Sequence, residues 1–117
     1  MLRNPSPTEL FLLRFLICEA NCFAPSREIL ESLKVADMED GGMGSLRLFS
    51  NRLDTLEVRF GESAGACQFT DEDGVDVIVS LNLDQHGNLY ELDIWKTDFG
   101  KIIRIPDNQN ALRREEM

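Results

Sequence analysis

The sequence predicts an α+β domain in which two N-terminal helices pack on one face of an antiparallel sheet of about four to six strands. Three observations predict this class. Helical periodicity comes first along the chain, and segments that alternate between apolar and polar residues follow it. The two clearest alternating segments are separated by the turn sequence DQHG, which is typical of an antiparallel hairpin.

The segment that begins at Ser6 predicts the first helix. Ser6 is a suitable N-cap, Pro7 suits the first turn, and Glu9 stands where a capping box needs its acid. The residues that follow, LFLLRFLICEA, present so wide an apolar arc that we expect this helix to be buried against the sheet. A second, short helix is expected to begin near Pro25 and Ser26 and to carry Ile29, Leu30 and Leu33.

Strand patterns start near Val35. KVADM and SLRLFS are expected strands on either side of a glycine-rich loop, and TLEVRF is a third candidate, with a short helix from Asn51 as the alternative. We expect GESAG to be a loop, ACQFT a strand, and DEDG a turn in which Gly74 supplies a positive φ. The clearest strands are Val75–Asn82 and Leu89–Lys96, and KIIRI is expected to be the last, closed by Pro106.

Composition limits the domain count and the class of partner. The chain of 117 residues is expected to form one domain over residues 1–106, followed by a polar, flexible tail over residues 107–117. A formal net charge of -9 argues against nucleic acid and anionic membranes as partners and favours a basic partner or simple solubility. Three cysteines do not suggest a disulfide framework, and the apolar run that follows Glu9 is interrupted by Arg14. We therefore expect a cytoplasmic protein without a membrane span or a signal peptide.

The central hairpin separates its side chains into an apolar face and an acidic face. The loop length predicts three facing pairs, which are Leu81 with Tyr90, Val79 with Leu92, and Val77 with Ile94. Together with Val75, these residues form the face that the helices should cover. The opposite face then carries Asp76, Ile78, Ser80, Asn82, Leu89, Glu91, Asp93 and Trp95.

Three functions compete for that acidic face. The segment from Asn82 to Asp93 resembles a calcium loop, but its fifth position is His86 and its last ligand is a short Asp, so we expect no metal site. A nuclease-like cluster would need Lys96 on the same face as the acids, and alternation places it on the other. A docking surface fits better, because acids steer a basic partner and tryptophan is a frequent hot spot. The competing structural interpretation is that Trp95 is a core residue under a loop.

Two other motifs favour structural interpretations. Cys18 and Cys22 lie four apart on one face of an apolar helix, where they are expected to be small core residues and not a metal pair. The loop Gly41–Gly44 could cradle an anion, but it lacks a P-loop lysine and follows two acidic residues that would repel phosphate. A tight turn is expected there.

The segments DGGMGSL (Asp40–Leu46) and ELDIWKTDF (Glu91–Phe99) resemble a family of small bacterial proteins of unknown function. An acidic DxDG hairpin, here Asp71–Gly74, is part of the same resemblance, which covers roughly Val35 to Pro106. That family implies no settled activity. In size, acidity and plan the chain also resembles immunity proteins that neutralise toxins of bacterial competition systems, which implies inhibition by occlusion and no catalytic residues.

We therefore expect a cytoplasmic binding protein, namely an immunity protein that occludes a basic toxin domain, with no enzymatic activity and no cofactor. The alternative is a small metal- or ligand-binding domain, or an enzyme, that uses the same acidic face. The contact surface is expected to comprise Asp76, Glu91, Asp93 and Trp95, with an adjacent steering edge made of Asp71, Glu72 and Asp73.

Overall fold

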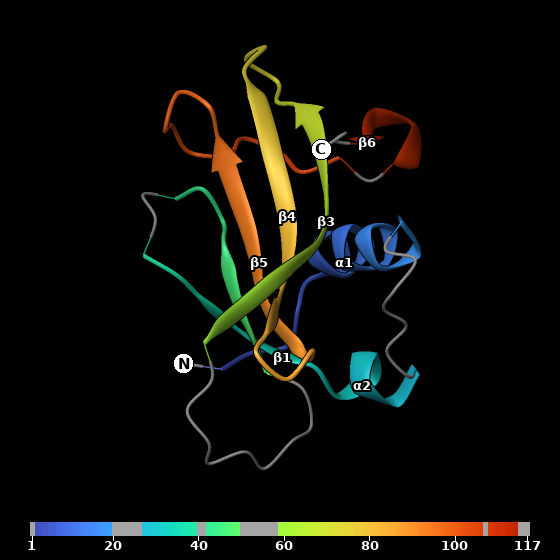
Figure 1. The fold of residues 1–117 in the computed structure, drawn as a ribbon. Helices are drawn as coiled ribbons and strands as arrows, with labels where there is room; N and C mark the ends of the chain where they lie inside the picture. Colours follow the sequence, from blue (N-terminus) through green and yellow to red (C-terminus); the bar gives the residue numbers. More distant parts are fainter. Residues whose placement is uncertain (1, 20–26, 40–41, 50–58, 107, 115–117) are drawn as a thin grey trace.

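The structure, a computed structural model, describes residues 2–19, 27–39, 42–49, 59–106 and 108–114, and it shows an α+β fold (Figure 1). Its strands form one antiparallel sheet in the order β1-β2-β5-β4-β3-β6, with α1 on one side. The helical elements are α1 (Pro7–Glu19), α2 (Arg27–Ser32) and a short 3-10 turn (Gln109–Ala111). The strands are β1 (Lys34–Asp37), β2 (Leu46–Phe49), β3 (Phe60–Thr70), β4 (Asp76–Asp84), β5 (Leu89–Lys96) and β6 (Arg113–Arg114). The predicted fold class is thereby confirmed in its general plan.

The first helix begins with the capping box that the sequence predicts. The backbone N–H of Glu9 donates to Ser6 Oγ at 3.2 Å, and the backbone N–H of Ser6 donates to Glu9 Oε1 at 2.7 Å. The helix lies against β3 and β4, and it contributes three fully buried leucines to the core, namely Leu12, Leu13 and Leu16. None of the described helices has the length and hydrophobicity that crossing a membrane requires.

The prediction of two helices packed on the sheet is wrong for the second one. The segment α2 has only six residues, and α1 alone covers the sheet broadly. Six residues make less than two helical turns, which is too short for a full apolar face. Leu30 is only partly buried against the core, and Leu33, which is fully buried, follows the helix.

The central hairpin keeps the predicted faces but not the predicted pairing. Val77 pairs with Lys96, Val79 with Ile94, and Leu81 with Leu92, so the register differs by two residues from the expected one. A shift of two leaves the side chains of Val77–Asn82 and Glu91–Lys96 on their predicted faces, because the side-chain period of a strand is also two. A β-bulge beyond Asn82 then makes Tyr90 an extra residue and turns Leu89 into the core, where it is 5% exposed.

Three other expectations about segments from Phe60 onward are also wrong. GESAG is part of β3, which runs antiparallel to β4 with two irregularities in its register. Gly61 is required there, because a Cβ at this position would lie 2.2 Å from the carbonyl oxygen of Asp84. KIIRI is not a strand, and the described residues after Pro106 are not a free tail. Leu112 is 7% exposed and joins the core, while β6 pairs with β3.

Two expected features lie outside the described residues. The alternative helix from Asn51 falls on such residues, and so do Thr55 to Val58 of TLEVRF; only the end of that segment is described, where Phe60 begins β3. By contrast, KVADM and SLRLFS contain β1 and β2, as predicted.

Candidate protein-binding surface

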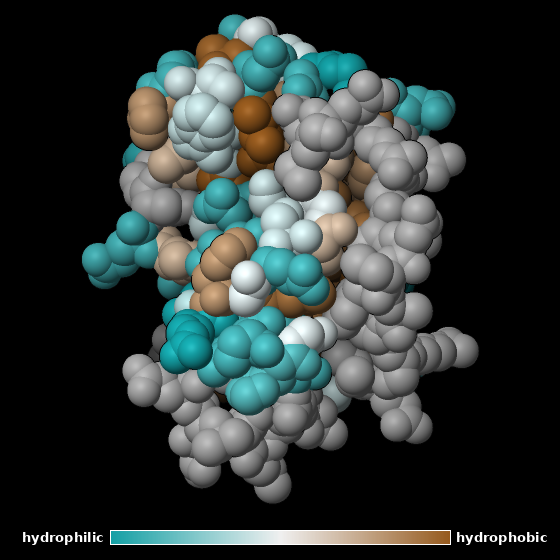
Figure 2. All heavy atoms as spheres, in the orientation of Figure 1, coloured by the Kyte–Doolittle hydropathy of each residue, from teal (hydrophilic) through white to brown (hydrophobic). Residues whose placement is uncertain are grey.

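The face of β4 and β5 that turns away from α1 carries the residues that the sequence assigns to a docking surface. Cross-strand pairing places Trp95 beside Ile78, Asp93 beside Ser80, and Glu91 beside Asn82. In Figure 2, hydrophobic side chains reach the surface beside hydrophilic ones near the end of the molecule where β5 terminates in Figure 1. We refer to Asp76, Ile78, Asp93, Trp95 and Phe99 as the aromatic–acidic patch.

Trp95 is a surface residue and not a core residue under a loop. It is 39% exposed, although its neighbours along β5, Ile94 and Lys96, are almost fully buried. Its ring contacts the ring of Phe99, with centroids 6.0 Å apart and an angle of 57° between the planes. Such a tilted arrangement is favourable for aromatic pairs. The pair therefore offers a preformed apolar contact area to a partner.

Phe99 is the residue of this patch that sequence reasoning missed. It follows the turn after β5, where its backbone N–H donates to the carbonyl of Lys96 at 2.8 Å. Its φ is 62°, a left-handed conformation that costs an L-residue about 1–2 kcal/mol and normally selects Gly or Asn. Its side chain is nevertheless 70% exposed, so burial does not explain the choice of a phenylalanine. A Phe directly before Gly100, at the end of the turn sequence KTDF, is the sequence signal that could have found it.

The three acids that the sequence assigns to this face differ in how far they are neutralised. Asp76 accepts a hydrogen bond from Thr70 Oγ1 at 3.0 Å and forms an ion pair with Arg113 at 3.5 Å. Glu91 accepts from Asn82 Nδ2 at 3.2 Å and faces Arg47 across the strands. Asp93 is exposed and accepts a long hydrogen bond from Ser45 Oγ at 3.4 Å, but in the part of the chain that the structure describes it forms no ion pair. Negative charge is thus most available next to Trp95.

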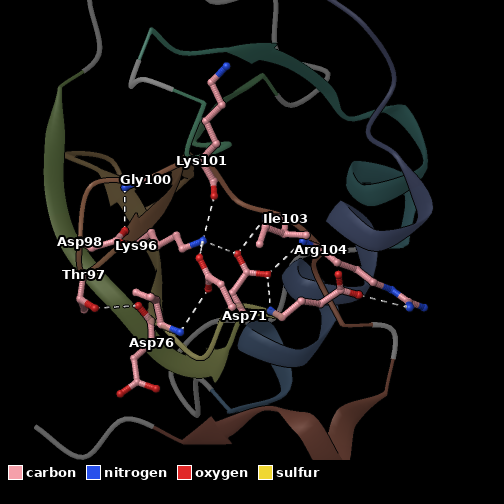
Figure 3. A network of polar contacts seen from close by, with 12 residues as sticks. Asp71, Asp76, Lys96, Thr97, Asp98, Gly100, Lys101, Ile103 and Arg104 are labelled. Carbon is pink, nitrogen blue, oxygen red and sulfur yellow. Dashed lines mark hydrogen bonds and ion pairs between the residues drawn. The ribbon is translucent and has the colours of Figure 1, made fainter.

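The expected steering edge is mostly a structural network (Figure 3). The Lys96 ammonium, 2% exposed, donates to Asp71 Oδ2 at 2.9 Å, to Asp73 Oδ2 at 2.7 Å and to the carbonyl of Lys101 at 2.9 Å. Asp71 is 3% exposed, so it cannot contact a partner as predicted. Asp73 is exposed, but its carboxylate is paired with Lys96. Glu72 is exposed and only weakly paired, with Arg104 at 3.9 Å.

Asp71 also explains why KIIRI is not a strand. Its carboxylate accepts from the backbone N–H groups of Ile103 at 2.8 Å and of Arg104 at 3.0 Å, and from that of Glu72 at 2.8 Å. These N–H groups would otherwise be available to a neighbouring strand. The carboxylate therefore anchors the segment after Gly100 to the end of β3.

Hydrogen bonding sets the charge states in this network. Burial raises the pKa of Asp71, but the backbone N–H of Ile103, the Lys96 ammonium and two further N–H groups outweigh it and lower the pKa from 3.8 to about 2. The bond from Lys96 also lowers the pKa of Asp73, and the bond to Asp73 raises the pKa of Lys96.

We expect the stability of the protein to fall steeply in acid because of Asp71. A carboxyl group with a lowered pKa in the folded state stabilises the fold above its ordinary pKa of 3.8, and this contribution is lost as the pH falls towards about 2. Urea midpoints measured between neutral pH and about pH 2 should show this loss, and Asp71→Asn should flatten the profile below about pH 4. An equally steep profile in that variant would contradict the assignment.

The residues that resemble a calcium loop form a plain hairpin turn. Asp84 is 6% exposed, and its Oδ1 accepts from the backbone N–H groups of His86 at 2.8 Å and Asn88 at 3.0 Å. No group of three or more potential metal ligands occurs among the described residues. Cys22 and the side chain of Cys18 lie outside that part of the chain.

The glycine-rich loop is described only in its second half. Gly42 and Gly44 have φ values of 87° and 92°, which glycine adopts without strain. The carbonyl of Gly42 accepts from the backbone N–H of Ile102 at 3.2 Å, so this part of the loop packs against the segment that Asp71 anchors. Gly41 lies outside the described residues.

Fold and surface together define a small α+β domain. A helix covers one face of its sheet, and an exposed aromatic pair lies on the other face. The chain belongs to a family described as a domain of unknown function (DUF6984), whose family model matches residues 2–106. This confirms the resemblance to a family of unknown function. Neither the curated proteins nor the solved structures contain a significant match to the chain.

Proposed function

We propose that this protein is a binding module that docks a basic protein partner on the aromatic–acidic patch. The observation that carries the proposal is the exposed Trp95–Phe99 pair, which lies beside the unneutralised carboxylate of Asp93. Aromatic side chains supply most of the energy at protein interfaces, and nearby charges accelerate association with an oppositely charged partner. The net charge of -9 supports a basic partner.

As a finer proposal, the partner is a toxin domain of a bacterial competition system, and this protein is the cytoplasmic immunity protein that occludes it. The small, acidic α+β plan, which resembles that of immunity proteins, supports this proposal. The proposal involves no catalytic step. Co-expression tests the finer proposal: if a toxin-like gene lies beside the gene for this chain, the protein should restore the growth of cells that express that toxin, and no rescue would refute the proposal.

Affinity capture from the organism that encodes the chain, followed by mass spectrometry, supplies a partner for a purified binding assay. Trp95→Ala should then weaken binding by about 2 kcal/mol or more, roughly 30-fold in Kd, mainly through faster dissociation. Asp93→Asn should instead slow association, and this loss should shrink as salt is added, because salt screens exposed charges.

The matched control is Phe60→Ala. Phe60 is 56% exposed and pairs with Asp84, at the opposite end of β4 from Ile78 and Trp95. This variant should bind like the parent protein, and thermal melts should show that all variants are folded. Binding by Trp95→Ala that is as tight as the parent's would place the docking surface elsewhere and refute the proposal.

A further inference from the structure

The aromatic pair has a chemical preference as well as an apolar area. The faces of tryptophan and phenylalanine rings carry negative electrostatic potential and attract cations, with tryptophan the strongest. Alternation along β5 puts Asp93 on the same side as Trp95, at a spacing of roughly 6–7 Å along the strand. A cationic group that rests on the Trp95 ring is therefore within reach of a carboxylate.

The geometry points to an arginine of the partner: we propose that its guanidinium stacks on the Trp95–Phe99 pair and forms an ion pair with Asp93. This inference rests on the proposed function and names the partner group that the patch recognises. Arginine fits better than lysine, because its planar guanidinium can stack on a ring with its face while its edge donates to a carboxylate. Asp98, exposed and directly before Phe99, adds a second negative charge at the same end of β5.

The chain contains the same type of contact elsewhere on its sheet. The guanidinium carbon of Arg47, on β2, lies 4.4 Å from the centroid of the ring of Tyr90, on β5. Arg47 pairs across the strands with Glu91, the residue after Tyr90. That contact is made within the chain, between β2 and β5. The Trp95–Phe99 pair lies near the other end of β5, and no cation–π contact occupies it among the described residues. A partner arginine would form with the Trp95 ring the cation–π contact that Arg47 forms with the Tyr90 ring.

The backbone at Phe99 gives an independent reason to assign a binding role. A left-handed conformation at φ 62° is unfavourable for phenylalanine, and glycine would adopt it freely. A residue that is strained and 70% exposed is expected where the side chain is needed for contact and not for folding. Replacing it by glycine should therefore weaken recognition without weakening the fold, which a structural aromatic residue would not allow.

The test uses a short arginine peptide, acetylated and amidated, with lysine and glutamate peptides of the same length. Trp95 is the single tryptophan of the chain, so its fluorescence reports the patch directly. We expect the arginine peptide to change Trp95 emission in a saturable way at low salt, where exposed charges are least screened. The lysine peptide should bind several-fold more weakly, and the glutamate peptide should have no effect.

Phe99→Gly separates ring recognition from attraction by net charge, because it leaves every charge in place. It should lower the affinity for the arginine peptide several-fold and leave the melting temperature of the protein unchanged or higher. Phe60→Ala should behave like the parent protein in both measurements. Asp93→Asn should reduce the preference for arginine. Equal affinity for the arginine and lysine peptides, full affinity in Phe99→Gly, or a clearly lower melting temperature in that variant would each overturn the inference.

The outcome is distinguishable from a failure of the proposed function. If Trp95→Ala weakens binding of the captured partner but the parent protein does not prefer arginine peptides, the arginine assignment is wrong and the docking surface stands. If Trp95→Ala leaves the partner's affinity unchanged, the docking surface itself is wrong.

Discussion

Asp71→Ala is expected to destabilise the protein by about 3–5 kcal/mol, the cost of removing one member of a buried, hydrogen-bonded ion pair. Asp71 accepts from the Lys96 ammonium and from three backbone N–H groups, and its side chain is fully buried. Without it, the ammonium keeps Asp73 and a carbonyl, but the backbone N–H groups of Ile103 and Arg104 lose the carboxylate that accepts from them. Such unsatisfied donors add to the loss.

Urea unfolding followed by far-ultraviolet circular dichroism measures this effect. Asp76→Ala is the matched control, because Asp76 is an exposed aspartate at the start of β4, and its loss should cost well under about 1 kcal/mol. Hydrogen exchange should also become faster at the amides of Ile103 and Arg104 in Asp71→Ala. Equal unfolding midpoints for the two variants would show that the network does not hold this segment.

Leu13→Ala is expected to cost about 2–5 kcal/mol, because it leaves a cavity between α1 and the sheet. Leu13 is fully buried in the core cluster, whereas Ile17, one turn later, is only partly buried against it. Ile17→Ala should therefore cost clearly less than Leu13→Ala. Denaturant midpoints that both variants leave unchanged would contradict the packing of α1 on the sheet, and equal large losses would contradict the different burial.

The capping box and the two-residue alternation were sufficient to predict α1, the central hairpin and its two faces. Both signals are local: Ser6 and Glu9 lie three apart, and each strand shows its own alternation. The register could not be predicted in this way, because a shift of two residues preserves both faces. One residue of the shift arises in the turn, where Leu83 pairs with Leu89, and the other from the bulge that leaves Tyr90 unpaired; no hydrophobic pattern encodes either.

The roles of Asp71 and KIIRI depended on contacts between residues far apart in the sequence. An aspartate in a turn sequence is ordinarily exposed, and KIIRI has the composition of a strand. Contact with Lys96, Ile103 and Arg104 overrides both local preferences, since a buried carboxylate must find donors. Because these contacts bury Asp71, it cannot belong to the steering edge that the sequence predicted.

The candidate surface was only partly predictable. Alternation placed Asp93 and Trp95 on one face, which the structure shows, but it could not show that Asp76 pairs with Arg113 from the last strand. Phe99 lies beyond the regular strand, where alternation makes no statement. Its position followed only from the turn that brings its ring to Trp95.

The most direct test of the docking surface is a single fluorine-19 resonance. Protein labelled with 5-fluorotryptophan carries one label, at Trp95, so the partner's own tryptophans do not interfere. Addition of the purified partner should shift or broaden this resonance in proportion to the fraction bound and reduce its exposure to solvent, as expected for an interface hot spot. A resonance that stays unchanged in a saturated complex would contradict the account.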